Sequence, residues 1–354
     1  MKYINWLLVF FPIAVLAELL HWGDLIVFVT SALAIVPLAG QLGVATEALA
    51  EKTGPRLGGL LNASLGNAAE LIITIIAINA GRLELVKASI IGSILGNILL
   101  VMGASILVGG LKNGIQKFNR SIAGQDATLM ILAVIVLSVP SFFNTAIEPD
   151  KLHVEEFSLA TSVAILAIYV LYIIYSLRNR ADQEGEEGNT VKAVHPGPGW
   201  SLQRALLVLA LAVVGIAVMS EFLVGSVEAV TISLGFTEFF VGIIIVPIIG
   251  NIAEHLVAVQ VALKNQMDLS LSIAVGSSLQ IALFVAPILV FVSLLIGNPL
   301  TLEFNNFEIV ATIAATIIAA FSSLDVGSNW LEGAMLLVVY TILALAFFFL
   351  PPTL

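Results

Sequence analysis

The stretch GNAAE at residues 66–70 recurs as GNIAE at residues 250–254, 184 positions later, and each copy lies inside a long apolar run. Each copy ends on a glutamate, Glu70 or Glu254, so the sequence places two carboxylates within apolar segments. A charged side chain at the centre of a bilayer costs at least about 2.5 kcal/mol, and such residues usually serve a function. The repeated motif therefore predicts a membrane protein with two functional intramembrane acids.

The composition of the whole chain agrees with a membrane protein. Of its 354 residues, 59% are hydrophobic and only 11% are charged, whereas soluble domains carry about 25% charged residues. A water-soluble globule is therefore excluded. The chain contains no cysteine, which excludes disulfides, thiolate metal sites and thiol nucleophiles.

Apolar runs between polar breaks predict an all-α polytopic protein with eleven transmembrane helices. The longest polar stretch, residues 179–199, is rich in Gly, Glu and Pro and is predicted to be an acidic linker. The predicted helices lie near residues 5–20, 24–50, 56–80, 84–110, 124–146, 152–178, 200–224, 238–263, 268–296, 304–322 and 330–350.

Lysine and arginine are distributed unevenly between the predicted loops. If the helices alternate in direction, eleven of the 14 basic residues fall on the side of the N-terminus. The positive-inside rule then places the N-terminus and the linker in the cytoplasm and the C-terminus outside. Part of the formal net charge of −10 is local, because four acids fall within residues 182–187. No nucleic-acid partner is expected.

Two further landmarks repeat in the same order as the GNxAE motif. GSIL at residues 92–95 recurs as GSSL at residues 276–279, and residues 47–54 resemble residues 228–235. Three matched landmarks imply a unit of five helices, and because five is odd the second copy enters the membrane from the opposite side. Inverted repeats are common in secondary transporters, which bind substrate between the repeats. The predicted parts are an extra N-terminal helix (1–22), a first repeat (23–178), the linker (179–199) and a second repeat (200–354).

Polar side chains accompany each motif glutamate at helical spacing. Asn67, Glu70 and Thr74 stand at i, i+3 and i+7, so they form one stripe that must face protein or water. Carboxylate, amide and hydroxyl oxygens suit a hard cation such as Ca²⁺, and Mn²⁺ is chemically compatible. Each neutral side chain could equally serve helix packing. The following helices add Ser89, Ser93 and Asn97 in the first half, and Ser277 and Gln280 in the second.

The two glutamates can also bind protons. A buried carboxylate accepts a proton more readily than an exposed one, and two carboxylates that share a site repel each other. Ca²⁺ and protons would then compete for the same oxygens. Exchange follows if the loaded forms of the site cross the membrane and the empty, doubly charged form does not.

Three other titratable residues could assist such exchange. His255 could relay protons to Glu254, although consecutive helical positions point about 100° apart, and an interior structural histidine is an equal alternative. Glu47 and Glu228 could line a gate or an access route. Alternatively, Glu47 and Glu228 are structural acids that cap helices at the membrane interface.

The motifs GNAAE and GNIAEH, each followed by a helix with a GS pair, resemble the two signature regions of the calcium/proton exchangers within the cation/Ca²⁺ exchanger superfamily. The resemblance covers essentially the whole chain. It implies one extra N-terminal helix, two inverted five-helix halves and exchange of cytosolic Ca²⁺ for H⁺. It also implies that Glu70 and Glu254 bind the ion. The residues that line the site would be Asn67, Ser93, Asn97, Asn251, Ser277 and Gln280.

The chain departs from the family pattern in two respects. Gln280 stands where the first half has Gly96, and Ile281 stands where it has Asn97, so the two half-sites cannot coordinate an ion identically. The long N-terminal extension of plant members is missing, which favours a prokaryotic plasma-membrane protein over a vacuolar one.

Competing functions are a sodium-coupled Ca²⁺ exchanger with the same fold, a passive cation channel and an intramembrane hydrolase. A channel would usually need several subunits around a shared pore, whereas this chain supplies a pseudo-symmetric pair by itself. Nothing besides the two acids resembles a catalytic set, so the chain is not expected to be an enzyme. No cofactor is expected beyond transported Ca²⁺ (or Mn²⁺) and H⁺, and the oligomeric state is left open.

Overall fold

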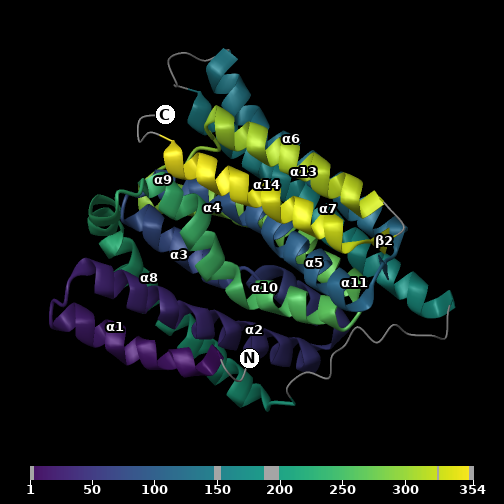
Figure 1. Ribbon diagram of the computed structural model, residues 1–354, viewed down its shortest axis with the longest axis horizontal. Helices are drawn as coiled ribbons and strands as arrows, with labels where there is room; N and C mark the ends of the chain where they lie inside the picture. Colours follow the sequence, from purple (N-terminus) through teal and green to yellow (C-terminus); the bar gives the residue numbers. More distant parts are fainter. Residues whose placement is uncertain (1–3, 147–152, 187–198, 325–326, 351–354) are drawn as a thin grey trace.

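The computed structural model describes residues 4–146, 153–186, 199–324 and 327–350. Within these ranges the chain is almost entirely helical and forms eleven helices when those joined by a π-helical turn are counted once (Figure 1). Nine of them are long and apolar enough to cross a membrane, and the two shorter ones are Ile4–Leu19 and Ala68–Asn79. The predicted all-α membrane fold is confirmed.

The first half contains an additional helix and five helical segments. They are η1 Ile4–Val9 with α1 Phe10–Leu19, α2 Asp24–Leu65, α3 Ala68–Asn79, α4 Leu83–Leu95 continuing through the π-helical turn η2 Gly96–Val101 into α5 Met102–Asn113, α6 Arg120–Ala146 and α7 Val154–Glu186.

The second half repeats this order. It comprises α8 Leu202–Leu234, α9 Glu238–Phe240 continuing through η3 Val241–Ile245 into α10 Val246–Leu263, α11 Met267–Gln280 continuing through η4 Ile281–Val285 into α12 Ala286–Ile296, α13 Asn306–Leu324 and α14 Trp330–Phe349. One short antiparallel pair joins the halves, with β1 Gln116–Lys117 against β2 Gly327–Ser328.

Several predicted helix ends are wrong. α2 does not end near residue 50 but continues to Leu65, and the chain turns only at Gly66 and Asn67, so the span predicted at 56–80 is divided between α2 and α3. A polar break marks the end of a membrane span, not the end of a helix. α8 likewise extends past the predicted end at 224 and stops at Gly235, whose φ of +69° favours glycine. α7 reaches Glu186, and linker residues 187–198 lie outside the described residues.

The connections between helices gather at two ends of the bundle. We call one the Arg82 end, formed by residues 80–82, 235–237 and 297–305. The other is the Lys117 end, formed by residues 114–119, 264–266 and 327–329. Equivalent hydrogen bonds recur at opposite ends, as inversion requires. Asn298 Nδ2 donates to the Ile78 carbonyl (2.9 Å) at the Arg82 end, and Gln116 Nε2 donates to the Ala262 carbonyl (2.9 Å) at the Lys117 end.

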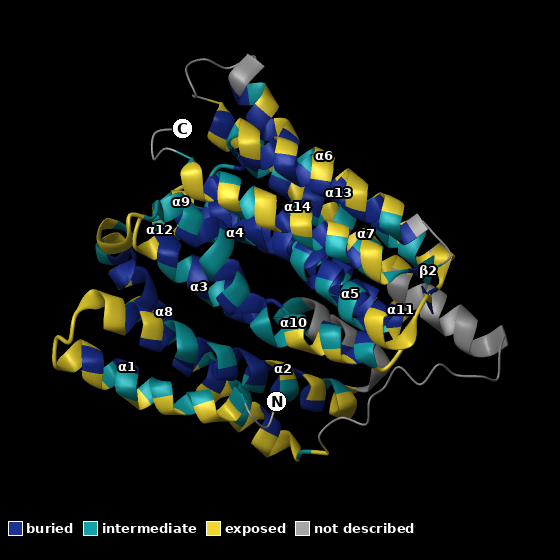
Figure 2. Ribbon diagram, viewed as in Figure 1, coloured by how far each residue is buried: buried dark blue, intermediate teal, exposed yellow. Residues whose placement is uncertain are grey.

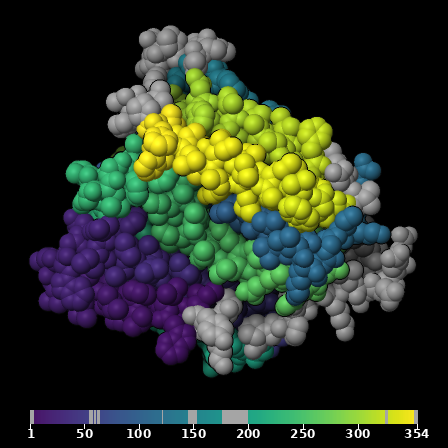
Figure 3. Space-filling view, viewed as in Figure 1, coloured from purple at the N-terminus to yellow at the C-terminus, as the bar shows by residue number. Residues whose placement is uncertain are grey.

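The helices form two groups. α1, α2 and α8 lie together along one side, where α2 and α8 pack against each other, and the remaining helices form the larger group (Figure 1). Figure 2 shows that burial concentrates in α4 and the helices around it, whereas α14 presents many exposed residues. In the space-filling view of Figure 3, the first helices (purple) and the last helix (yellow) lie on opposite sides of the face turned to the viewer. Large exposed apolar side chains on outer helices, such as Leu211 of α8 and Ile342 of α14, suit contact with lipid.

Candidate functional site

The two GNxAE motifs meet inside the larger group of helices. Glu70 lies in the first turn of α3 and is 2% exposed, and Glu254 lies on α10 with its Oε2 atom buried. A Cβ atom placed on Gly250 would lie 3.6 Å from the Glu70 Cβ, so α3 and α10 pass each other at the motifs. The structure therefore brings the two motif helices into contact, away from the lipid-facing surface.

The chain reaches this crossing differently in the two halves. In the first half the helix is interrupted at Gly66 and Asn67, immediately before α3, as the glycine predicts. In the second half α10 runs through Gly250 without interruption, and the irregularity lies upstream in the π-helical turn η3. π-Helical turns also follow Ser93 and Ser277 as η2 and η4, and such turns are frequent at functional sites.

Glu70 is held by donors from both halves. The hydroxyl group of Ser93 on α4 donates to Glu70 Oε1. Asn251 Nδ2 on α10 lies 3.4 Å from Glu70 Oε2 and 3.3 Å from Ser93 Oγ. The carboxylate therefore connects α3, α4 and α10.

The same arrangement recurs around the second motif. Ser277 Oγ on α11 donates to Asn67 Oδ1 at 2.9 Å, which mirrors the contact between Asn251 and Ser93. Ser277 also lies close to the carboxyl group of Glu254. Asn67, Ser93, Asn251 and Ser277 are all buried. Each of the two hydrogen-bonded groups therefore contains residues of both halves, and together we call them the central cluster.

The residues that break the symmetry also find partners. Asn67 Nδ2 donates to Gln280 Oε1 at 2.7 Å. Asn97, which the second half lacks, lies 3.2 Å from His255 Nε2 through its Oδ1 atom. Among the described residues, Asn97 is the hydrogen-bond partner of the His255 ring, and the relay from His255 to Glu254 stays a prediction.

Three polar atoms of α4, η2 and α10 are buried without a hydrogen-bond partner among the described residues. They are Ser89 Oγ, Asn97 Nδ2 and Glu254 Oε2. Buried polar atoms are usually paired, and exceptions commonly mark a functional site or a place for water or an ion. The oxygens here, from carboxyl, amide and hydroxyl groups, are those that hard cations prefer. Within the described residues no group of three or more His, Asp or Glu side chains is placed to hold a metal, so a cation would depend on neutral oxygens.

Glu47 and Glu228 lie apart from this cluster. Both are exposed, and Glu228 pairs with Arg82 at 2.5 Å (Oε2 to Nη2). Arg82 also pairs with Glu238 at 3.3 Å, so it links the turn before α4 to α8 and α9. The hydrogen bond that Arg82 donates to Glu228, together with the nearby charges of Glu238 and Glu228, raises the pKa of Arg82 above its usual value. Arg82 was not predicted, because a basic residue at a span end is typical of an interfacial anchor.

The two sides of the cluster are packed differently. A Cβ atom at Gly92 would lie 2.0 Å from the Ile243 carbonyl oxygen, so η3 presses directly on α4 toward the Arg82 end. Gly276 is the equivalent position on α11 toward the Lys117 end, and a Cβ atom there would meet no described atom within 4 Å. The structure is therefore closely packed at Gly92, on the Arg82 side of the cluster, and has open space at Gly276, on its Lys117 side.

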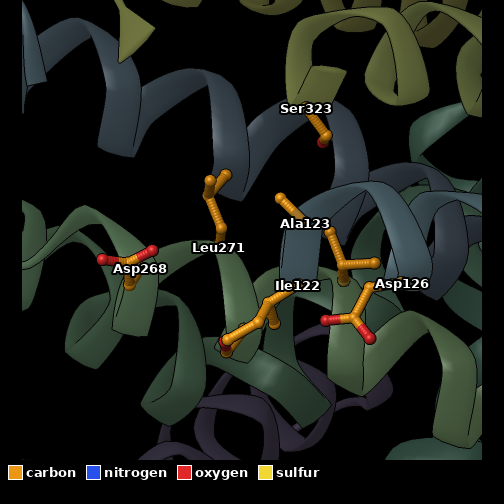
Figure 4. Close-up of a pocket in the computed structure, with 8 residues that line it drawn as sticks. Ile122, Ala123, Asp126, Asp268, Leu271 and Ser323 are labelled. Carbon is orange, nitrogen blue, oxygen red and sulfur yellow. The ribbon is translucent and has the colours of Figure 1, made fainter. Parts of the chain in front are cut away.

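A cavity of about 50 Å³ opens at the Lys117 end, separate from the central cluster. Asp126 of α6 and Asp268 of α11 lie on opposite sides of it in Figure 4, with Ile122 and Leu271 between them. Asp268 stands 184 positions after Glu84. The 184-residue offset is therefore the signal in the sequence that marks Asp268 as the counterpart of Glu84.

Three comparisons indicate the relatives of the chain. A family model described as sodium/calcium exchanger protein matches residues 24–178 and 204–349. A Ca²⁺/H⁺ antiporter of Aphanothece halophytica is 44% identical, with 98% of this chain and 96% of that protein covered. A Ca²⁺/H⁺ antiporter of Bacillus subtilis is 42% identical, with 96% of each chain covered.

The solved structures agree with the sequence comparisons. The structure of native YfkE is 38% identical and superposes with a TM-score of 0.85 over 98% of this chain and all of that chain. The relatives therefore share the whole architecture and not a single motif.

Proposed function

The chain belongs to the sodium/calcium exchanger protein family, and from this premise we propose that it is a secondary active antiporter that exports cytosolic Ca²⁺ in exchange for H⁺. The observation that carries the proposal is the buried Glu70, bonded to a hydroxyl and an amide group from both inverted halves where α3 crosses α10, the helix that carries Glu254. The relatives that cover nearly the full chain are Ca²⁺/H⁺ antiporters, which supports this choice.

In the proposed mechanism the two glutamates bind either Ca²⁺ or protons. Two carboxylates neutralise one divalent cation or two protons, and the surrounding amide and hydroxyl oxygens of Asn67, Ser93 and Ser277 complete a shell for a hard cation. The empty site would carry two buried charges, and uncompensated buried charge is costly. The site would therefore cross between its two orientations only when loaded, which couples the two fluxes.

The coupling ion is tested by transport into inside-out vesicles. We expect an acidic lumen to drive ⁴⁵Ca²⁺ uptake without sodium, and a sodium gradient at equal pH to drive none. Acidifying the lumen supplies protons that leave as Ca²⁺ enters, so collapsing the pH gradient should stop uptake. Uptake that follows the sodium gradient and ignores the pH gradient would make the protein a sodium-coupled exchanger.

We further propose that the structure represents the cytoplasm-facing state of an alternating-access cycle. The Lys117 end is the more basic end, and the positive-inside rule places it in the cytoplasm. The open space beside Gly276 lies on that side, whereas η3 covers the Arg82 side at Gly92. The opposite orientation would bring a similar close contact to Gly276.

Arg82 with Glu228 and Glu238 is proposed as the external gate of this cycle. Replacing Arg82 by Gln should favour opening at the Arg82 end, because it removes two ion pairs between the α3–α4 turn and helices α8 and α9. The effect should be several-fold, since partly exposed ion pairs contribute at most about 1 kcal/mol each.

Because the chain contains no cysteine, an introduced cysteine is the only thiol that a labelling experiment detects. Buried Ser226 on α8, changed to Cys, should react several-fold faster with a membrane-impermeant thiol reagent applied from outside when Arg82 is Gln. Lys87→Gln is the control, because it removes a positive charge at the same end of the bundle, whereas the ion pair of Lys87 with Glu84 lies within α4 (3.2 Å). Equal labelling rates in all three backgrounds would argue against the gate.

A further inference from the structure

A buried carboxylate outside the central cluster lies at the start of α13. Glu308 is 3% exposed, and its Oε2 atom accepts a hydrogen bond from the Asn305 backbone N–H at 2.8 Å. The Glu308 N–H in turn donates to Asn305 Oδ1 at 2.8 Å, which completes a capping box. Glu308 Oε1 is buried and has no hydrogen-bond partner among the described residues. The helix cap therefore uses one carboxyl oxygen and leaves the other free for another ligand.

The charged groups around Glu308 do not neutralise it directly. Its charged neighbours among the described residues are Glu84 and Lys87, at the start of α4. Lys87 Nζ is already paired with Glu84 Oε1 at 3.2 Å. On the preceding segment, Glu303 is hydrogen-bonded to Asn144 of α6. A buried carboxyl group between these helices suits a proton better than a cation, because a lysine stands beside it.

Below Glu308, α13 continues a buried polar stripe toward the middle of the membrane. Thr312 and Thr316 follow at i+4 and i+8, and both are buried. Thr312 Oγ1 donates to the Glu308 carbonyl at 2.7 Å, whereas Thr316 Oγ1 has no partner in the described part of the chain. Thr316 and Ile98 of η2 line a cavity of about 10 Å³, roughly the space of one water molecule. α13 packs against η2, the turn that carries both Ile98 and Asn97, so the stripe runs beside the turn that carries Asn97.

The internal repeat places a similar pair of acids at the other end. Glu84 and Asp268 begin α4 and α11 and stand 184 positions apart. Glu308 and Asp126 lie near the starts of α13 and α6, the corresponding helices of the two halves. Asp126 and Asp268 line the cavity of Figure 4, as Glu308 and Glu84 neighbour each other at the Arg82 end. An exchanger must take up protons on one side of the membrane and release them on the other, and the repeat supplies an acid pair at each end of the bundle.

We propose that Glu308 is an external proton-binding site, and that the buried stripe of α13 carries protons between it and the central cluster. This inference rests on the proposed Ca²⁺/H⁺ exchange. A proton from external water binds Oε1 and gives a neutral carboxylic acid. It then leaves to hydrogen-bonded water along Thr312 and Thr316, and the carboxylate is restored.

The test replaces Glu308 by Gln, which preserves the capping box but cannot bind a proton there. In inside-out vesicles the external face is the lumen. We expect Glu308→Gln to lower proton-driven ⁴⁵Ca²⁺ uptake roughly tenfold, within the range for loss of a proton-transfer group, and to remove most of its dependence on lumenal pH. Exchange of ⁴⁵Ca²⁺ for unlabelled Ca²⁺ at equal pH needs no proton movement and should stay at the wild-type rate.

Three controls complete the experiment. Glu155→Gln, an exposed acid of α7, should leave both fluxes unchanged. Thr316→Val should slow only the proton-driven flux, and Thr316→Ser should restore it. A Glu308→Gln protein with wild-type lumenal pH dependence, or one that loses both fluxes together, would overturn the proton site. Wild-type protein without proton-driven uptake would instead reject the proposed function.

Discussion

Glu70→Gln and Glu254→Gln should each lower proton-driven ⁴⁵Ca²⁺ uptake by more than about a hundredfold. An amide can neither balance half of the charge of Ca²⁺ nor carry a proton. Removing one partner from a buried ionic interaction costs about 3–5 kcal/mol, and each 1.4 kcal/mol is a factor of about ten in affinity. The measurement is initial uptake in inside-out vesicles that contain equal amounts of each variant.

Glu156→Gln is the matched control for these two variants, because Glu156 is an exposed acid on α7. It should transport at the wild-type rate. The two motif variants should also lose exchange of ⁴⁵Ca²⁺ for unlabelled Ca²⁺, unlike Glu308→Gln. Transport that survives in both motif variants would show that the ion binds elsewhere.

Gly92→Val should destabilise the folded protein strongly, whereas Gly276→Val should not. The added side chain at Gly92 meets the backbone of η3, with the Cβ atom 2.0 Å from the Ile243 carbonyl oxygen. Backbone cannot rotate away as a side chain does, and overpacking typically costs about 1–3 kcal/mol or more. We expect a thermal unfolding midpoint in detergent lower by roughly 5 °C or more for Gly92→Val, and a near wild-type midpoint for Gly276→Val.

Transport separates the two valine variants further. If the Lys117 side must pack as the Arg82 side does now, Gly276→Val should fold normally but exchange Ca²⁺ slowly, because the added side chain blocks that closure. Gly276→Ala adds the smallest side chain and should be impaired less. Normal transport by Gly276→Val would contradict alternating close contacts at these two glycines.

The eleven helices and their inversion could be predicted because hydropathy and the repeated motifs depend on local sequence. The ends of the helices could not be predicted in this way. α2 runs past its membrane span to Leu65 because polar residues can remain helical outside lipid. Gly66, a poor helix former, stands at the interruption before α3, whereas the irregularity of the second half lies in the π-helical turn η3, which no residue type indicates in the sequence.

The central cluster was predictable in its members but not in its partners. The repeat indicated that Glu70 and Glu254 belong to equivalent positions, and burial of the site amides and hydroxyls agrees with their polar stripes. The contact of Asn97 with His255 depends on how α10 and η2 pack, which spacing within one helix cannot show. Nothing in the sequence distinguishes Glu308 from an acid at a membrane interface, because its burial depends on the packing of α13 on α4 and α6.

The central claim is that Ca²⁺ and protons compete for Glu70 and Glu254. Its most direct test is calorimetry of Ca²⁺ binding to the purified protein near neutral pH, in two buffers of different ionisation enthalpy. The difference in heat gives the number of protons released per Ca²⁺ bound. We predict release of between about one and two protons, with neither binding nor release in the variant that carries both Gln substitutions. Tight Ca²⁺ binding that releases no protons, or that survives in the double variant, would contradict the account.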